Sequence, residues 1–147
     1  MTSHLTHVPA PEGLAPSAQY SHVVWGTGRF VAISGQLALD GEGALVGAGD
    51  PAAQARQVFA NVERCLAAAG AGFGDVVKLT YFLTDVAHLP AVREARDAAF
   101  AGLPLPASSA VQVGALVRPE LLMEVEAFAL VPEERPEEER PELRLVR

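Results

Sequence analysis

The chain of 147 residues has little of several features on which common protein classes depend. Its one cysteine, Cys65, excludes a disulfide within the chain and a metal site made of thiolates. No uninterrupted apolar run reaches the roughly 18 residues of a membrane-spanning helix. Positive charge is also scarce, with 11 Lys and Arg against 18 Asp and Glu and a formal net charge of −7. A nucleic-acid groove needs a basic face, so this composition argues against nucleic acid as a partner.

The two ends of the chain differ from its middle. The first residues lack the charged start and long apolar segment of a signal peptide, so we expect a cytoplasmic protein. Residues 1–18 are rich in Pro, Ser and His without periodicity and predict a flexible N-terminal arm. Residues 132–147 alternate charged blocks with proline and predict a disordered acidic tail. Between them, residues 19–131 are long enough for one domain with a hydrophobic core.

Residue spacing predicts two helices. Asp50 can cap the free amides of a first turn, Pro51 suits the first helical position, and Gly70 can end the helix in a left-handed conformation. Its apolar face would hold Ala55, Val58, Phe59, Val62, Leu66 and Ala69. Its polar remainder would be Gln54, Arg56, Gln57, Asn61, Glu63 and Arg64. A second helical segment is expected from Asp85 to about Gly102.

The remaining regular segments predict strands at residues 21–25, 30–34, 76–83, 109–116 and 121–131. The Gly-containing link 26–29 indicates that the first two form a hairpin. In the third strand Val77, Leu79, Tyr81 and Leu83 would share one face. This element order favours an α+β fold, with a single sheet and two helices packed on one face. The other face would expose Leu122, Phe128 and Leu130, which suggests that another subunit covers it.

Glu124 and Glu126 are the most promising catalytic pair in the residues themselves. Two positions apart on a strand, they point to the same side at about 7 Å. Paired carboxylates can perform acid–base chemistry when their surroundings separate their pKa values. The alternative is that both face solvent or a subunit interface. His4 and His7 have ligand-compatible spacing but no third ligand nearby in sequence, so no metal site is expected.

Several segments, in order along the chain, resemble the YjgF/RidA family of small imine and enamine deaminases. They are Tyr20-Ser21-His22, Val31-Ala32-Ile33-Ser34-Gly35-Gln36, Gln54 to Val62, Asp75 to Asp85, Pro106-Ala107-Ser108-Ser109 and Met123-Glu124-Val125-Glu126-Ala127. The match covers about residues 17 to 131, and the two ends lie outside it.

The resemblance implies a homotrimer of chorismate-mutase-like α+β subunits, with clefts between neighbours that bind a small-molecule ligand. It implies no metal or organic cofactor. In the family an arginine of Pro-Ala-Arg-Ser grips the substrate carboxylate, and the first glutamate of Glu-x-Glu-Ala orients the hydrolytic water. By position, Glu124 is then the catalytic residue, and the substrate-binding residues are Tyr20, Ser34, Gly35, Ser108 and Ser109.

Ser108 departs from the family pattern because it stands in place of that arginine. Arginine binds a carboxylate through a planar, permanently charged fork, whereas serine offers one hydroxyl. Losing such a contact in a desolvated cleft costs roughly 2–5 kcal/mol. Arg93 or Arg118 could supply the missing charge. Alternatively, the cleft accepts a neutral or differently charged ligand.

We therefore expect a RidA-like hydrolase that deaminates a reactive imine, enamine or related small metabolite, with a substrate altered by Ser108. The alternative is a non-catalytic trimer that binds a metabolite or another protein. A ribonuclease, which the family's older endoribonuclease L-PSP label suggests, is disfavoured by the acidic charge and the lack of a basic or aromatic stripe.

Overall fold

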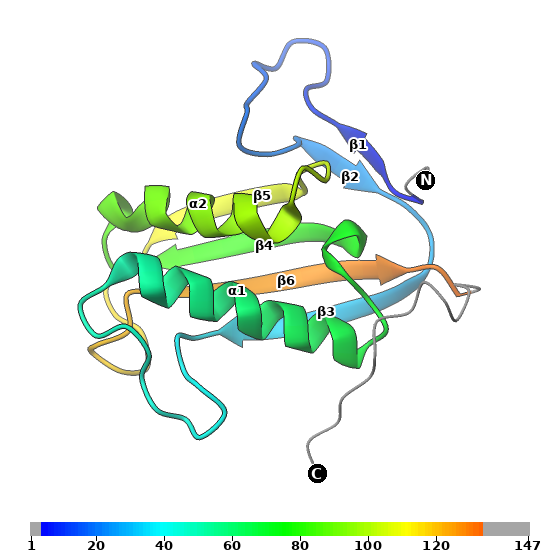
Figure 1. Ribbon diagram of the computed structural model, residues 1–147. Helices are drawn as coiled ribbons and strands as arrows, with labels where there is room; N and C mark the ends of the chain where they lie inside the picture. The colour runs from blue at the N-terminus through cyan, green and yellow to red at the C-terminus, as the bar shows by residue number, and fades with distance from the viewer. Residues whose placement is uncertain (1–3, 134–147) are drawn as a thin grey trace.

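Two helices cover one face of a four-stranded sheet in the computed structural model, which describes residues 4–133 (Figure 1). The helices are α1 (Pro51–Ala68) and α2 (Leu89–Phe100), with short 3-10 turns η1 (Phe73–Asp75) and η2 (Val86–His88). The sheet has the order β3-β6-β4-β5, with β3 (Arg29–Gln36), β4 (Val76–Leu83), β5 (Ala107–Gln112) and β6 (Met123–Val131). β4 and β5 are parallel and the other pairs antiparallel. The predicted α+β fold, with both helices on one face, is confirmed.

Helix α1 begins and ends where its sequence predicts. The Asp50 carboxylate accepts a hydrogen bond from the Ala53 amide at 3.1 Å, and Pro51 occupies the first turn. Gly70, just past the end, has φ +71°, which only glycine adopts without strain. The apolar residues Val58, Val62 and Leu66 are fully buried against the sheet, because they recur at helical spacing on one side of α1.

The expectation that Gln54 belongs to the polar face of α1 is wrong. Its side chain is fully buried, and every polar atom of its amide is used. The amide nitrogen donates to the carbonyls of Gly47 and Glu120 at 3.0 and 3.1 Å, and the amide oxygen accepts from the Leu122 N–H at 2.9 Å. Gln54 therefore joins the loop before α1 to the segment before β6.

We expect Gln54→Leu to lower the free energy of unfolding by about 1–3 kcal/mol, because it leaves the Leu122 N–H and the Glu120 carbonyl without the partner that the buried amide supplied. Urea unfolding at fixed protein concentration measures this loss. Gln57→Leu on the same helix is the matched control and should cost less, because water can replace the bonds of the half-buried Gln57. Equal losses in the two variants would contradict this role for Gln54.

Alternate residues of β6 face the helices. The buried set is Met123, Val125, Ala127, Ala129 and Val131, and the residues between them lie on the other face, called here the open face. In β4, Leu79, Tyr81 and Leu83 face the helices as predicted. Val76 takes the position expected of Val77, because the register with β6 shifts between Val76 and Lys78.

No described element covers the open face of the sheet (Figure 1). Phe30 is 62% exposed there, and its ring lies 5.6 Å from that of Phe128. Leu122 and Leu130 are only half-buried. An apolar surface of this kind fits the expected contact with another subunit, which stays a prediction at this point.

The predicted hairpin of residues 21–25 and 30–34 is wrong. β2 (Val23–Trp25) pairs antiparallel with β1 (Thr6–Val8) in a separate two-stranded sheet, whereas β3 pairs with β6. The glycines of the link serve another purpose. Gly28 has φ +143°, and a side chain on it would collide with the backbone of Val131. The link therefore carries the chain closely past the end of β6 from one sheet to the other.

The prediction of a flexible arm at residues 1–18 holds only in part. Regular structure starts within the predicted arm, where β1 begins at Thr6 and Leu5 is buried. The His22 amide also donates to the Pro9 carbonyl at 3.2 Å. Nearly all of the predicted disordered tail, residues 134–147, lies outside the described residues. Among the helices that are described, none is both long and apolar enough to cross a membrane.

Candidate functional site

A bulge in edge strand β3 places Gly35 against Glu124. Ile33 pairs with Ala127 and Gln36 with Val125, so that Ser34 and Gly35 together oppose the single residue Glu126. The extra residue bends β3 and brings Gly35 to the Glu124 side chain. A Cβ at Gly35 would overlap the Glu124 carboxylate, which only glycine can admit this closely. Ser34, Gly35 and Glu124 are called here the Glu124 half-site.

A groove of about 690 Å³ lies between the end of β3 and α1, and of the Glu124 half-site only Gly35 lines it. Gly35 and Gln36 line one end, and Asn61 and Cys65 of α1 line the other. The Asn61 amide donates to the Leu37 and Leu39 carbonyls at 2.9 Å, which holds the segment after β3 against the helix. Burial raises the pKa of the Cys65 thiol, so Cys65 is not a thiolate nucleophile at neutral pH.

Ser109 lies on the same open face as Glu124. It pairs with Thr80 of β4, which in turn pairs with Glu126 of β6. The Lys78 ammonium donates a hydrogen bond of 2.7 Å to the Ser109 hydroxyl. Ser109 is therefore engaged by the only lysine of the chain.

Ser108 lies on the opposite, helix-covered side of the sheet. It pairs with Leu79, which is fully buried beneath the helices. Burial raises the pKa of the nearby Tyr81 phenol, and the Arg96 guanidinium, the Arg93 charge and the Ser108 hydroxyl oppose that shift to a smaller extent, so the phenol stays protonated at neutral pH. Tyr81 is 2% exposed, and its hydroxyl has no hydrogen-bond partner in the described chain.

The segment that contains Tyr20 is tied to the residues just before β5 through Ser21. The Ser21 amide donates to the Pro106 carbonyl at 3.1 Å, and the Ser21 hydroxyl donates to the Leu105 carbonyl at 2.7 Å. These bonds tie the segment that follows β1 to the residues just before β5. The rings of Tyr20 and His22 make an edge contact at 5.2 Å.

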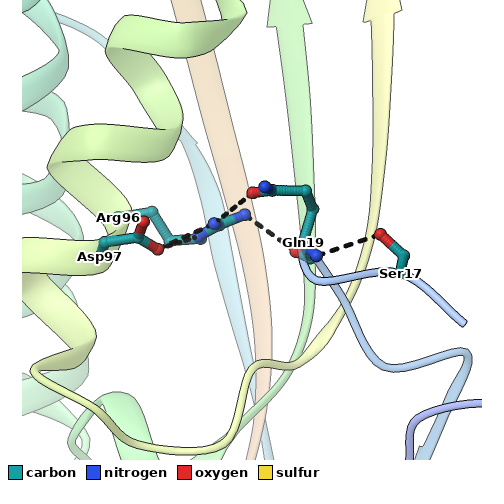
Figure 2. A network of polar contacts seen from close by, with 4 residues as sticks. All are labelled: Ser17, Gln19, Arg96 and Asp97. Carbon is teal, nitrogen blue, oxygen red and sulfur yellow. Dashed lines mark hydrogen bonds and ion pairs between the residues drawn. The ribbon is translucent and has the colours of Figure 1, made fainter.

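Arg96 of α2 fixes the other side of this segment (Figure 2). Its guanidinium donates at 2.8 Å both to the Gln19 backbone carbonyl and to the Gln19 side-chain oxygen. The Arg96 guanidinium also forms an ion pair with the Asp97 carboxylate at 2.8 Å. The backbone N–H of Gln19 donates to the Ser17 hydroxyl at 3.0 Å. Arg96 is 1% exposed, so α2 carries a desolvated charge that holds the residue preceding Tyr20.

Arg96 and Tyr81 were missed by the sequence analysis. A signal was present for Arg96, because it lies four residues after Val92 and one after Ala95 on the apolar stripe of α2. For Tyr81 the residue pattern predicts the buried face, but not that its hydroxyl finds no hydrogen-bond partner within residues 4–133.

Arg93 and Arg118, the two candidates for the missing charge, lie in different places. Arg93 is half-buried on α2, and its positive charge lowers the pKa of the Tyr81 phenol. Arg118 lies beyond the far end of β5 and donates to the Gly43 carbonyl at 3.1 Å. Of these two arginines, only Arg93 acts on Tyr81, whose β4 strand pairs with the strand of Ser108. Tyr20, Tyr81, Arg93 and Ser108 are called here the Ser108 half-site.

The two half-sites are separated within one chain. Glu124 is in register with Phe82 on the open face, and Ser108 with Leu79 on the helix-covered face. Three residues along β4 amount to ~10 Å, and two steps between strands to another ~10 Å. A small ligand cannot touch both half-sites of the same chain, so a site that uses both must combine two chains.

Within residues 4–133 no three His, Cys, Asp or Glu side chains gather closely enough to hold a metal ion. The His4 ring instead lies 2.8 Å from the Leu130 carbonyl and 3.5 Å from the Asp75 carboxylate. His4 thus anchors the start of the described chain to the end of β6.

Comparisons with known proteins are consistent with one another. A family model described as Endoribonuclease L-PSP matches residues 11–131. Protein DfrA of Myxococcus xanthus is 38% identical over 82% of this chain and 89% of its own length. The 2-iminobutanoate/2-iminopropanoate deaminase of Mus musculus is 36% identical over 82% and 85%. A solved structure of the Rid-family protein YyfB from Yersinia pestis superposes with a TM-score of 0.80 at 38% identity, covering 87% of this chain and 99% of that one.

Proposed function

Because the chain belongs to the Endoribonuclease L-PSP family, also called YjgF/RidA, we propose that it is a hydrolase that deaminates a small imine or enamine. Relatives about 36% identical include a 2-iminobutanoate/2-iminopropanoate deaminase, which acts on the imino group of small acids. The observation that carries the proposal is the Glu124 carboxylate held over Gly35 on the open face of the sheet.

Glu124 acts as the base and then as the acid of the reaction. Water adds to the carbon of the C=N bond while the Glu124 carboxylate accepts one of its protons. Glu124 passes that proton to the nitrogen, which gives a carbinolamine. The hydroxyl proton of the carbinolamine then moves through Glu124 to the same nitrogen as the C–N bond breaks, so that ammonia leaves and a carbonyl remains. One water is consumed, one ammonia is released, and the carboxylate is regenerated. No metal or cofactor is needed for these steps.

The active clefts lie between the subunits of a homotrimer in this proposal. Two features support it: the exposed apolar surface around Phe30, and the placement of Glu124 and Ser108 on opposite faces of one sheet. The Glu124 half-site of one chain would meet the Ser108 half-site of its neighbour. Ser109, on the open face, would line the cleft beside Glu124. The cytoplasmic location stays a prediction from the sequence.

The first test is ammonia release from 2-iminopropanoate and 2-iminobutanoate, generated in situ by an amino-acid oxidase. We expect the wild-type protein to accelerate release above the spontaneous rate in proportion to its concentration, because a positioned carboxylate contributes about 10²–10⁴-fold. Boiled protein is the control. A rate equal to that of the blank at every protein concentration would contradict deamination of these two substrates.

A non-catalytic binding trimer is the second candidate, and the loss of the family arginine at Ser108 favours it. It would bind the stable oxo analogues of these imines without releasing ammonia. Saturable binding of 2-oxobutanoate together with a blank-level rate would select this candidate.

A further inference from the structure

Tyr20 is held on both sides by its neighbours, while its own hydroxyl is not used by the described chain. On one side, the Arg96 guanidinium donates at 2.8 Å to both the backbone carbonyl and the side-chain oxygen of Gln19. On the other side, Ser21 forms hydrogen bonds of 3.1 and 2.7 Å to two carbonyls just before β5. The Tyr20 hydroxyl forms no hydrogen bond with any residue in the range 4–133. The chain therefore fixes the backbone around Tyr20 and leaves the polar end of its side chain available.

The loop that carries Tyr20 is also closed by bonds of its own. The His22 N–H donates to the Pro9 carbonyl at 3.2 Å, and the His22 ring lies 2.9 Å from the Ala15 carbonyl. The same ring makes the edge contact with Tyr20 at 5.2 Å. Residues 9–22 thus form an internally bonded loop in which the half-buried Tyr20 ring is braced. The remaining freedom of this ring depends on how the loop is attached to α2.

Arg96 makes that attachment although burying a charge is unfavourable (Figure 2). Its side chain is 2% exposed, whereas its ion-pair partner Asp97 is 63% exposed, so water weakens the pair and the desolvation of the guanidinium is only partly offset. Two nitrogens of the planar guanidinium bind two acceptors of the same residue, which fixes both the backbone and the side chain of Gln19. A buried charge of this kind specifies one conformation of the segment that it binds.

We propose that Arg96 and Gln19 are positioning residues that hold Tyr20 in the conformation that contacts the ligand. The inference rests on the proposed function, because the proposed cleft contains Tyr20 as part of the Ser108 half-site. Arg96 is 1% exposed and does not itself reach the ligand, so it acts through Gln19. A side chain that is ordered before the ligand arrives loses less conformational entropy on binding, which lowers the dissociation constant.

Binding of 2-oxobutanoate to the full chain, measured by isothermal titration calorimetry, tests this inference without requiring turnover. We expect Gln19→Ala to raise the dissociation constant at least about threefold, because the ligand must then order Tyr20. The variant should stay folded, since Arg96 keeps Asp97 and the backbone carbonyl of residue 19 as acceptors. Asp97→Asn is the matched control. It retains both bonds from Arg96 to Gln19 and should bind 2-oxobutanoate like the wild type.

A double-mutant cycle shows whether Gln19 acts through Tyr20. Tyr20→Ala removes the side chain that is positioned, so Gln19→Ala should raise the dissociation constant no further in that background. If the effects of the two substitutions multiplied instead, Gln19 would influence binding by another route, and the inference would fail.

Fluorine NMR of the protein labelled with 3-fluorotyrosine observes the positioning directly. The chain has two tyrosines, and Tyr81→Phe assigns their signals. In Gln19→Ala we expect the Tyr20 signal to move toward its position in the unfolded protein, because the ring samples more conformations. Asp97→Asn should leave the signal in place. A Tyr20 signal that Gln19→Ala does not change would overturn the inference.

The same variants separate this inference from the proposed function. Binding that Gln19→Ala weakens through Tyr20, without ammonia release by the wild type, would uphold the inference while the proposed function fails. Ammonia release with the same KM in Gln19→Ala and the wild type would uphold the proposed function and overturn the inference. Where both hold, Gln19→Ala should raise KM and leave kcat within about twofold of the wild type. An absence of saturable 2-oxobutanoate binding by the wild type would also overturn the inference.

Discussion

Glu124→Gln is expected to lower kcat/KM for ammonia release from 2-iminopropanoate by about 10²–10⁴-fold, while the protein remains folded and assembled. Glutamine has nearly the same shape as glutamate and can still lie against Gly35, but its amide cannot accept a proton from water. Because only the proton-accepting step is removed, the fall should appear in kcat, with binding of the oxo analogue retained. The measurement is the steady-state rate at several substrate concentrations, corrected for spontaneous hydrolysis.

Glu126→Gln is the matched control for this prediction. Glu126 lies two residues further along β6 on the same open face and pairs with Thr80 of β4, but the side chain that lies against Gly35 is that of Glu124. Its loss should change kcat/KM by no more than about twofold, as for an ordinary surface substitution. If the two variants lost activity equally, the general charge of the open face would be responsible, and the assignment of Glu124 would fail.

Arg96→Met is expected to cost about 2–4 kcal/mol of unfolding free energy, which is the largest effect on stability that the described contacts predict. Methionine fills much of the same buried volume but leaves the Gln19 backbone carbonyl and side-chain oxygen without their donors. Urea unfolding at fixed protein concentration measures the loss, since unfolding of an oligomer depends on concentration. Released from α2, the segment around Tyr20 should also become more sensitive to limited proteolysis.

Asp97→Asn provides the control for Arg96→Met. The Asp97 side chain is 63% exposed, and an amide oxygen can still accept from Arg96, so the expected cost is below about 1 kcal/mol. An unfolding midpoint for Arg96→Met equal to that of the control would show that the Gln19 contacts contribute nothing to stability.

The sequence predicts the ends of α1 correctly because contacts between residues close in sequence determine them. Asp50, Pro51 and Gly70 mark the ends of α1 through bonds and dihedral angles within a few residues. The hairpin prediction failed because pairing in this sheet is between distant segments. β3 meets β6 about 100 residues later, and Gly28 allows a close pass beside Val131 rather than a turn. Residue types in two short strands and a Gly-rich link cannot distinguish these cases.

Prediction of the site was limited in a similar way. The resemblance brought Gly35 and Glu124 together, and the bulge at Ser34 and Gly35 explains how they meet. The separation of Ser108 from Ser109 onto opposite faces depends on the register of β5 with β4, which no local pattern specifies. Burial of Gln54 and Arg96 likewise depends on loops that fold over them from elsewhere in the chain.

The sheet acts as a partition between two kinds of chemistry, and this bears on how such a chain can change over time. Ser108 lies on the side of the sheet that the helices cover, while the proposed proton-transfer residue Glu124 lies on the opposite surface. A substitution on one side, such as serine for arginine at position 108, leaves the packing around Glu124 untouched. Substitutions on the helix-covered side can therefore change ligand selectivity without changing the residue proposed for proton transfer. Protein engineering can likewise vary one face of the sheet while the residues of the other face are retained.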